Sequence, residues 1–340
     1  SHATSGPDPT HKRATKHNTP NQKNGPGHIH GRTIVGATGE GKKLVDVGPN
    51  AYVLSKLGSR HSDEAMEFIE QQVDAAKPFF LYYPANSNHG PYTPDDEIGG
   101  KPVKGAARTK SGDPMDARHD YIYENDVALG RLIDYLEKTD DPRNSGQKLI
   151  SNTIVIFTSD NGAEKNSDIA SGPFRSHKGS CYEGGHRVPF IVSWKDGKIG
   201  DGDASAPGLT NDSPISLCDM FATFAEILDS PLPDLPNGQK GAEDSISVLS
   251  AMRGETIEER PPLFFNDHKE MKKEDNAVAA MRVDSPVLDG KKIEGNWKIF
   301  FDASLLREGK AAPFELYDLA NDQWEATNRI EDPSLKPLVN

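Results

Sequence analysis

Two oxygen-bearing side chains, those of Asp160 and Asn161, come directly after an apolar run near the middle of the sequence. The run, residues 153–158, is rich in β-branched and aromatic side chains, which is typical of a strand buried on both faces, and a Ser-Asp-Asn-Gly turn ends it. Ligands of an open α/β sheet bind outside the carboxyl ends of its strands. Carboxylate and amide oxygens are the ligands that Ca²⁺ and Mg²⁺ prefer. The pattern therefore predicts a hard-cation site, although Asp-Asn-Gly is also an ordinary turn sequence.

A single histidine, His89, lies in a loop that follows another predicted strand. Residues 79–83 are apolar and aromatic, which predicts a second buried strand, and residues 84–94 contain three prolines and a glycine. Such a loop is irregular, and a histidine in it can titrate near neutral pH. If the two strands run parallel, His89 and Asp160 share the carboxyl edge of the sheet. His89 is therefore a candidate site residue, the alternative being a solvated loop histidine.

A lysine, Lys178, stands among small residues in a third loop. Paired glycines follow at Gly184 and Gly185, where the absence of a side chain lets backbone segments approach closely, and residues 188–194 form another predicted short strand. A lysine in a constrained loop can serve as a point cation beside a bound anion. Lys178 is therefore a candidate anion ligand, the alternative being an ordinary surface charge.

Three helices are predicted around these loops. One begins at Ser62 as its cap and stops before Lys77-Pro78, and a second covers residues 120–138. The second helix is the expected crossover that makes the two strands parallel. Ser213 caps the third, which runs to residue 228 and buries the following face. That face consists of Leu217, Met220, Phe221, Phe224 and Leu228.

Composition narrows the class of protein. The formal net charge of −13 argues against general nucleic-acid binding, and no apolar run suggests a transmembrane segment. Two cysteines, Cys181 and Cys218, are too few for a disulfide framework or a zinc site. Residues 1–31 are basic and histidine-bearing, so they either attract a polyanion or form a linker without a role. Because the chain begins at Ser1 without a signal-peptide pattern, we expect the true N-terminus to lie upstream.

Taken together, these blocks resemble the type I sulfatases. The resemblance lies in Pro78–Tyr83 with His89, in Phe157–Gly162, and in Lys178-Gly179 followed by residues 182–190. Their order and spacing are those of the family, which is more specific than any single motif. Residues 295–300 and 315–322 are similar to the family's C-terminal subdomain, a small antiparallel sheet with one helix. The resemblance covers roughly residues 60–325.

The resemblance assigns roles to the candidate residues. It implies that Asp160 and Asn161 are calcium ligands, that His89 contacts the substrate sulfate, and that Lys178 does so too. In such enzymes calcium acts as a Lewis acid and a template for the sulfate. His89 and Lys178 would stabilise charge on the sulfuryl oxygens or protonate the leaving alkoxide, and either could be the general acid.

The family's nucleophile is a formylglycine made from Cys or Ser in a C-x-P-x-R or S-x-P-x-R motif. We expect neither motif in this sequence, because neither Cys181 nor Cys218 opens one, and the early aspartate pair that completes the calcium site is missing. We therefore expect both features upstream of Ser1, and we expect this chain to be the C-terminal portion of a sulfatase that is inactive alone.

The sequence thus predicts an α/β sandwich of the alkaline-phosphatase-like type, incomplete at its N-terminal side. We expect the catalytic domain in residues 1–255 and a small α+β subdomain with an antiparallel sheet in residues 256–340. The predicted function of the complete protein is calcium-dependent hydrolysis of a sulfate ester, with a sulfated carbohydrate as one candidate substrate. Alternatives are a phosphoesterase or phosphonate hydrolase of the same superfamily and a non-catalytic binding protein. The family favours a secreted, periplasmic or lysosomal-type location.

Overall fold

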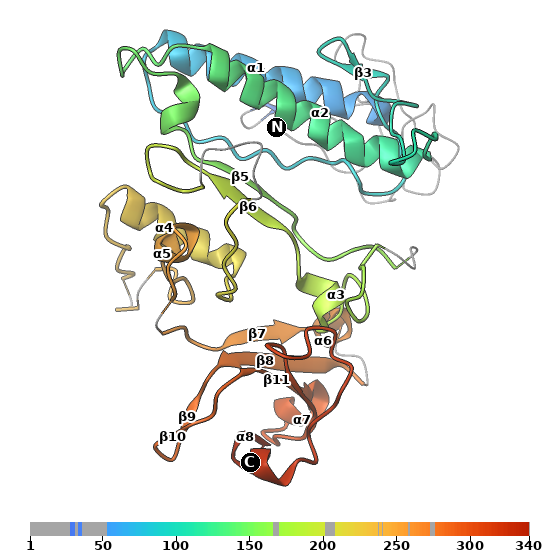
Figure 1. Ribbon diagram of the computed structural model, residues 1–340, viewed down its shortest axis with the longest axis vertical. Helices are drawn as coiled ribbons and strands as arrows, with labels where there is room; N and C mark the ends of the chain where they lie inside the picture. The colour runs from blue at the N-terminus through green and yellow to red at the C-terminus, as the bar shows by residue number, and fades with distance from the viewer. Residues whose placement is uncertain are drawn as a thin grey trace. The chain divides into compact units, whose positions relative to one another are not determined.

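The computed structural model describes the chain in several stretches (Figure 1). They are residues 28–30, 33–35, 53–165, 170–200, 208–236, 238–239, 241–257, 259–272 and 276–339. The chain forms two compact units, Ser1–Thr153 and Ile154–Asn340. The predicted basic segment lies outside the described residues, except that β1 (His28–His30) pairs antiparallel with β2 (Thr33–Val35). The predicted domain boundary at 255/256 stays a prediction.

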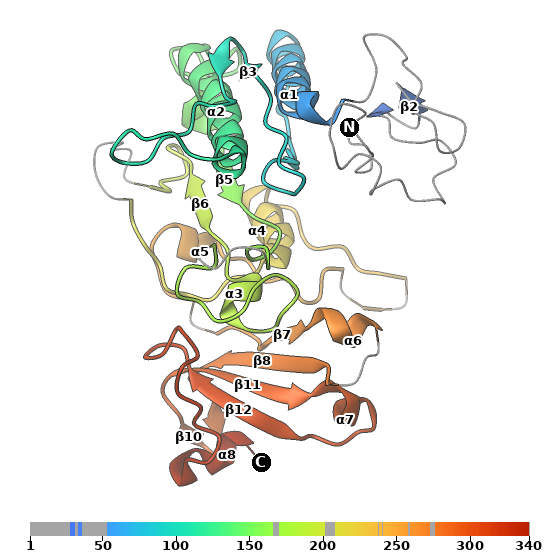
Figure 2. The same ribbon diagram turned by 90° about the vertical axis from the view of Figure 1, so that its right-hand side faces the viewer.

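Two long helices form the first unit. Helices α1 (Leu57–Asp74) and α2 (Ala117–Lys138) lie side by side (Figure 1, Figure 2). A buried apolar cluster of Ile98, Val103, Val127 and Ala128 lies between α2 and a short hairpin around residues 97–102. The remaining elements are η3 (Leu54–Lys56), the hairpin strands β3 (Glu97–Ile98) and β4 (Lys101–Pro102), and η4 (Leu149–Asn152).

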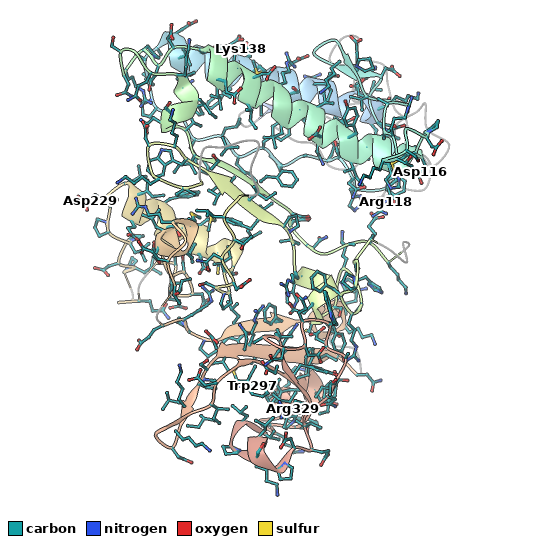
Figure 3. The ribbon with its side chains drawn as sticks, viewed as in Figure 1. Asp116, Arg118, Lys138, Asp229, Trp297 and Arg329 are labelled. Carbon is teal, nitrogen blue, oxygen red and sulfur yellow. The ribbon has the colours of Figure 1, made fainter. Side chains whose placement is uncertain are left out.

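The ends of the two helices differ partly from the prediction. Ser62 is not a cap but lies fully buried inside α1, where its hydroxyl accepts a hydrogen bond from Arg131 Nη1 at 3.0 Å. The helix starts earlier because η3 runs directly into it and buries Leu57. Helix α2 ends at Lys138 as predicted but begins at Ala117, because the Asp116 side chain caps it by accepting hydrogen bonds from the backbone N–H groups of Arg118 and His119. Asp116 and Lys138 mark its two ends in Figure 3.

The predicted buried strand at residues 79–83 does not form. The segment is extended, with Phe79, Leu81 and Tyr83 partly covered, but Phe80 and Tyr82 are 72% and 77% exposed. An extended segment becomes a strand only when a neighbouring backbone completes its hydrogen bonds. Among the described residues none pairs with this segment, so the expected parallel pair with residues 153–158 is absent as well.

The predicted central strand does form in the second unit, as β5 (Val155–Thr158). It pairs antiparallel with β6 (Phe190–Ser193), which confirms the strand predicted at residues 188–194. The expectation that β5 is buried on both faces is wrong, since Phe157 on β5 and Ile191 on β6 are exposed. Strand β5 nevertheless leads, as predicted, into the Asp160-Asn161 turn.

The third predicted helix is shorter and faces the other way. It consists of η5 (Leu217–Asp219) and α4 (Met220–Ile227), and Ser216, not Ser213, caps it by exchanging hydrogen bonds with Asp219. The predicted apolar face is wrong, because Leu217, Phe221 and Leu228 are exposed. Polar contacts decide the orientation instead: Thr223 accepts the N–H of Val248 at 3.0 Å, and Asp219 and Ser245 bind neighbouring backbone. Helix α5 (Leu249–Met252) follows that segment.

A four-stranded antiparallel sheet confirms the predicted C-terminal architecture (Figure 2). Its order is β12 (Pro313–Asp318), β11 (Asn296–Asp302), β8 (Val278–Asp284), β7 (Leu263–Asn266). Alternate residues of β11 serve two cores: Trp297 and Ile299 pack with Leu316 and Leu335, whereas Phe300 packs with Ala280 and Tyr317. Arg329 lies over the Trp297 ring at 5.6 Å (Figure 3).

Short elements complete the second unit, and in the described residues the sheet is accompanied by more than the single helix that the family resemblance implied. Strands β9 (Val287–Leu288) and β10 (Lys291–Lys292) form a small hairpin. The helical pieces are α3 (Glu183–His186), α6 (His268–Lys272), α7 (Ala303–Arg307), η6 (Pro333–Leu335) and α8 (Lys336–Val339). Of the helices in the described ranges, none combines the length and the hydropathy needed to cross a membrane.

Candidate functional site

The turn after β5 presents the two predicted cation ligands. Asp160 is exposed, and its carboxylate makes no hydrogen bond or ion pair with any described residue. The Asn161 side chain donates a hydrogen bond from Nδ2 to the carbonyl oxygen of Gly162 at 3.0 Å, which turns Oδ1 away from that contact. Ser159 stiffens the turn by donating from Oγ to the Asn161 carbonyl at 3.1 Å. Both side-chain oxygens are thus available to a ligand.

Backbone hydrogen bonds fasten this turn to the loop that carries Lys178. The Lys178 N–H donates to the carbonyl oxygen of Ala163 at 2.8 Å, and the Gly162 N–H donates to that of Gly185 at 2.9 Å. Within the second unit the structure therefore brings Asp160, Asn161 and Lys178 onto adjoining segments. The Lys178 side chain is exposed, and no described carboxylate pairs with it. The lysine and the two residues with oxygen ligands thus lie on adjoining segments, and no described side chain neutralises the charge of Lys178 or Asp160.

Three glycines make this approach possible. A Cβ on Gly162 would overlap the carbonyl oxygen of Gly184, and Cβ atoms on Gly184 and Gly185 would overlap the carbonyl oxygens of Ser176 and Ser180. The close approach predicted for the paired glycines is therefore present. The close approach of Gly162 was not predicted: the sequence identified this residue only as part of the turn that contains the Asp-Asn pair.

The donor chemistry at this turn fits a hard cation in part. Calcium prefers six to eight oxygen ligands, and a carboxylate with an amide oxygen supplies two of that kind. The described part of the chain holds no group of three or more His, Cys, Asp or Glu side chains placed to bind a metal. Asp160 and Asn161 can therefore contribute ligands to a calcium site but cannot complete one.

His89 belongs to the first unit, in the predicted irregular loop. Its Nδ1 lies 2.8 Å from the carbonyl oxygen of Gly90. Because a carbonyl oxygen can only accept, Nδ1 carries the hydrogen and donates a hydrogen bond to it. The exposed ring then presents Nε2, which can accept a proton. The loop curls back through a hydrogen bond from the His89 N–H to Asn86 at 3.1 Å.

A buried carboxylate, Glu124 of α2, holds both ends of the His89 loop. It accepts a hydrogen bond from the Ser87 hydroxyl and another from the Asp95 N–H at 2.6 Å. Gly58 of α1 leaves room for it, because a Cβ there would overlap the carboxylate. Burial raises the pKa of Glu124 to about 7. The sequence analysis missed this residue, although its spacing from Tyr121 and Val127 places it on the buried face of α2.

Glu124 makes the stability of the first unit depend on pH. Its folded-state pKa lies above the ordinary value of 4.5, so the stability it contributes is fully present below that value and is lost as the pH rises through about 7. We expect Glu124→Gln to be more stable than the wild type by about 2–3 kcal/mol near pH 8, and to differ little near pH 5. Urea unfolding of both proteins across this range measures the difference.

The matched control is Glu137→Gln, which changes an exposed glutamate on the same helix. It should leave the pH dependence of the wild type intact. A Glu124→Gln protein that follows the wild-type curve would contradict the assignment.

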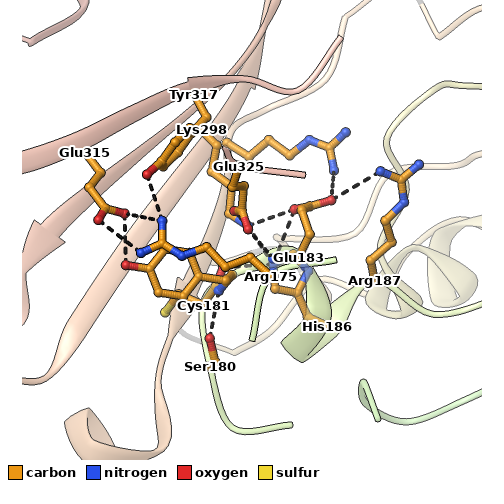
Figure 4. Close-up of polar contacts among 12 residues, drawn as sticks. Arg175, Ser180, Cys181, Glu183, His186, Arg187, Lys298, Glu315, Tyr317 and Glu325 are labelled. Atoms are coloured by element: carbon orange, nitrogen blue, oxygen red, sulfur yellow. Dashed lines mark hydrogen bonds and ion pairs between the residues drawn. The ribbon is translucent and has the colours of Figure 1, made fainter. Parts of the chain in front are cut away.

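A second buried polar cluster lies beside the Lys178 loop in the second unit (Figure 4). Glu183 of α3 and Glu325 both pair with Lys298, which β11 carries and which is 0% exposed. Burial works against ionisation of Glu183, but Lys298, Arg282 and His186 outweigh it and lower the pKa of Glu183 below its usual value. Burial, reinforced by Lys298, lowers the pKa of His186 to about 4, so this imidazole is neutral. No local pattern predicted this cluster, apart from a lysine at an inward position of β11.

The expectation that the chain lacks the nucleophile motif needs correction. The expectation that the motif is absent rests on the two cysteines, yet Ser171-Gly172-Pro173-Phe174-Arg175 has the S-x-P-x-R form. The structure gives Arg175 of this stretch an anchoring position: it stacks 3.8 Å above the Tyr182 ring and pairs with Glu315 at 3.2 Å. The pattern is therefore present, and its arginine is engaged in holding the loop to β12.

Comparison with known proteins agrees with these motifs. The family model described as Sulfatase matches residues 11–230. A sulfatase of Formosa agariphila is 28% identical over 282 residues, which are 81% of this chain and 46% of that protein. The N-acetylgalactosamine-6-sulfatase of Canis lupus familiaris is 29% identical over 216 residues, 62% of this chain and 35% of that protein. The chain thus spans less than half the length of either relative.

A solved structure shows the fold. It comes from work on the metabolism of multiple glycosaminoglycans by Bacteroides thetaiotaomicron, and it superposes with a TM-score of 0.60 at 23% identity. The match covers 92% of this chain and 57% of that one. It confirms the predicted α/β class of the alkaline-phosphatase-like type. Because the family model matches well over half of the residues, the chain belongs to the sulfatase family.

Proposed function

We propose that the protein to which these residues belong hydrolyses sulfate esters in a calcium-dependent reaction. One observation supports this most: backbone hydrogen bonds fasten the Asp160-Asn161 turn to the loop of Lys178, so that the segment with oxygen ligands for a cation adjoins the segment with an exposed lysine. A sulfate ester carries one negative charge, and both kinds of group can bind it. The sulfatase family supplies the reaction class.

Each residue has a task that its surroundings allow. Asp160 and Asn161 would hold calcium through their side-chain oxygens, and when bound this ion supplies Lewis-acid stabilisation of the sulfate. Lys178 Nζ, which no described carboxylate neutralises, keeps its full charge for the sulfuryl oxygens. His89, protonated on Nδ1, can accept a proton at Nε2 and deliver it to the leaving oxygen. His89 and Lys178 are both candidates for the general acid.

The nucleophile completes the proposal. We propose that a formylglycine supplied by residues outside these 340 would provide the nucleophile through a hydroxyl of its hydrated aldehyde, with the ester's alcohol leaving as it takes up a proton from the general acid. We also propose that the 340-residue chain alone does not turn over substrate. The serine of the 171–175 pattern is the alternative. Mass spectrometry of the peptide that contains Ser171 separates the two, because conversion of serine to formylglycine removes two hydrogen atoms.

The test of the proposed function compares two esters of the same phenol. The protein with its formylglycine region present is expected to hydrolyse the aryl sulfate and not the aryl phosphate, and a chelator should abolish turnover until calcium is added back. Faster hydrolysis of the phosphate would favour a phosphoesterase or phosphonate hydrolase. Absence of turnover of either ester with calcium and formylglycine present would favour a non-catalytic binding protein.

The name of one relative supports a proposal for the substrate class. Because the canine relative is named an N-acetylgalactosamine-6-sulfatase, we propose a sulfated carbohydrate as substrate. We also propose a secreted, periplasmic or lysosomal-type location, and a division into a catalytic domain ending near residue 255 and a C-terminal subdomain from residue 256.

A further inference from the structure

The loop that carries Lys178 is anchored on both sides to the four-stranded sheet. Arg175 stands three residues before Lys178 and Glu183 five residues after it. Strand β12 holds the first and strand β11 the second, and both strands are more than a hundred residues away in sequence. The sheet is thus in a position to determine where the Lys178 loop lies.

Strand β12 holds the first side through Arg175. Its guanidinium donates to Glu315 at 3.2 and 3.3 Å and to the Tyr317 hydroxyl at 2.8 Å. The Tyr182 hydroxyl donates to the same Glu315 at 2.9 Å, while its ring lies under the guanidinium. A planar guanidinium bound on its edge and covered on its face has little freedom to move.

Strand β11 holds the second side through Lys298. Its ammonium donates to Glu183 at 2.8 Å and to Glu325 at 2.9 Å, and it lies 2.9 Å from His186 Nε2, which itself lies 3.0 Å from the Cys181 carbonyl oxygen. Glu325 also accepts the Glu183 N–H at 2.8 Å. All three charged side chains are buried (Figure 4). The Phe265 and Phe300 rings lie 5.3 and 5.2 Å from the ammonium. The start of α3 therefore has one position relative to β11.

The segment between these anchors is held by its backbone and by the side chains of Cys181 and Tyr182, since the Cys181 thiol donates to the Val278 carbonyl oxygen at 3.2 Å. The Gly184 N–H donates to Arg175 at 2.8 Å, and the Lys178 N–H donates to Ala163 at 2.8 Å, whereas the Lys178 side chain meets no described partner. Moving α3 would move Gly184 and Gly185, and with them the backbone on which Lys178 sits. A buried ion pair is weak evidence for added stability, since apolar residues of similar volume often do as well. Its fixed geometry is a stronger reason for its presence here.

We propose that Lys298 is a positioning residue, which acts through Glu183 and Glu325 to set the place of Lys178 at the sulfate site. The role of Lys178 in this statement rests on the proposed function. Lys298 itself lies buried in the sheet and contacts no substrate.

The first experiment measures hydrogen exchange in the 340-residue chain itself. In Lys298→Met, the amides of residues 175–187 should exchange at least about tenfold faster, while β8, β12 and α4 keep their protection. Arg260→Met is the matched control, because it breaks another buried ion pair of the same unit, 2.8 Å to Asp219, that does not contact the loop. It should leave exchange in residues 175–187 unchanged. Unchanged exchange in Lys298→Met, or an equal rise across the unit, would overturn the proposal.

A milder variant covers the case in which Lys298→Met does not fold. Glu325→Gln removes one charge and keeps the pair of Lys298 with Glu183. It should accelerate exchange in residues 175–187 alone, and uniform acceleration would again count against the proposal.

The second experiment is a double-mutant cycle in the protein with its formylglycine region present. Lys298→Met should lower kcat/KM for a sulfate ester about 10–100-fold when Lys178 is present, the range for a catalytic group displaced by about an ångström. In the Lys178→Ala background the same change should have little effect. Equal losses in both backgrounds would show a merely structural role. The exchange result is independent of turnover, so failure of the positioning proposal and failure of the proposed function are distinguishable.

Discussion

Replacing Lys178 by alanine is expected to lower kcat/KM for a sulfate ester by at least about 100-fold, the effect of losing one electrostatic contact to a transition state. Lys178 lies on the loop that backbone hydrogen bonds fasten to the Asp160-Asn161 turn, and its ammonium group has no described partner to share its charge. Its removal leaves the charge that develops on the sulfuryl oxygens without this contact. Steady-state kinetics of the protein with its formylglycine region, at saturating calcium, measure the loss.

Two variants serve as controls for this result. Lys195→Ala removes another exposed lysine of the same unit and should leave turnover near that of the wild type. His177→Ala changes the direct neighbour of Lys178, whose Nδ1 bonds only to a backbone carbonyl at 3.0 Å, and should also have a small effect. If His177→Ala abolished turnover while Lys178→Ala kept it, the site would be placed one residue out of position.

Replacing Gly185 by alanine is expected to affect both stability and activity strongly. The added Cβ would overlap the main-chain carbonyl of Ser180, so the backbone itself must move. Over-packing against backbone should cost about 3 kcal/mol, the upper part of the usual range. Because Gly185 accepts the Gly162 N–H at 2.9 Å, the displacement reaches the Asp160-Asn161 turn, and kcat/KM should fall by about 100-fold. Urea unfolding and steady-state kinetics test the two effects.

The matched control for this substitution is Gly208→Ala. No atom lies within 4 Å of a Cβ built there, and its backbone has no positive φ, so both stability and activity should stay near the wild-type values. A Gly185→Ala protein as stable and as active as Gly208→Ala would show that the close approach of the glycines is not needed for the site.

Much of the local structure could be predicted because it depends on neighbouring residues. The run from Thr153 is followed by a turn, α2 ends at Lys138, and the C-terminal blocks form an antiparallel sheet. The paired glycines permit a close backbone contact, as their lack of side chains implies. The motifs around His89, Asp160 and Lys178 were sufficient to indicate the sulfatase family, because their order and spacing are properties of the chain alone.

Predictions that required a partner were the ones that went wrong. Residues 79–83 have the composition of a strand, but an extended segment needs a second backbone to become one. The apolar stripe of α4 suggested a face, whereas hydrogen bonds of Asp219 and Thr223 decided it. In both places the interaction that sets the structure comes from outside the segment.

The sequence by itself determined which residues we propose for the chemistry, since Asp160, Asn161, His89 and Lys178 were selected by type and spacing. Only the tertiary structure decided what holds them. Glu183 and Lys298 are 115 residues apart, and Glu124 reaches Ser87 across 37 residues. A buried charge is stable only beside its partner, and the identity of that partner depends on the folded path of the chain. No local pattern contains that information.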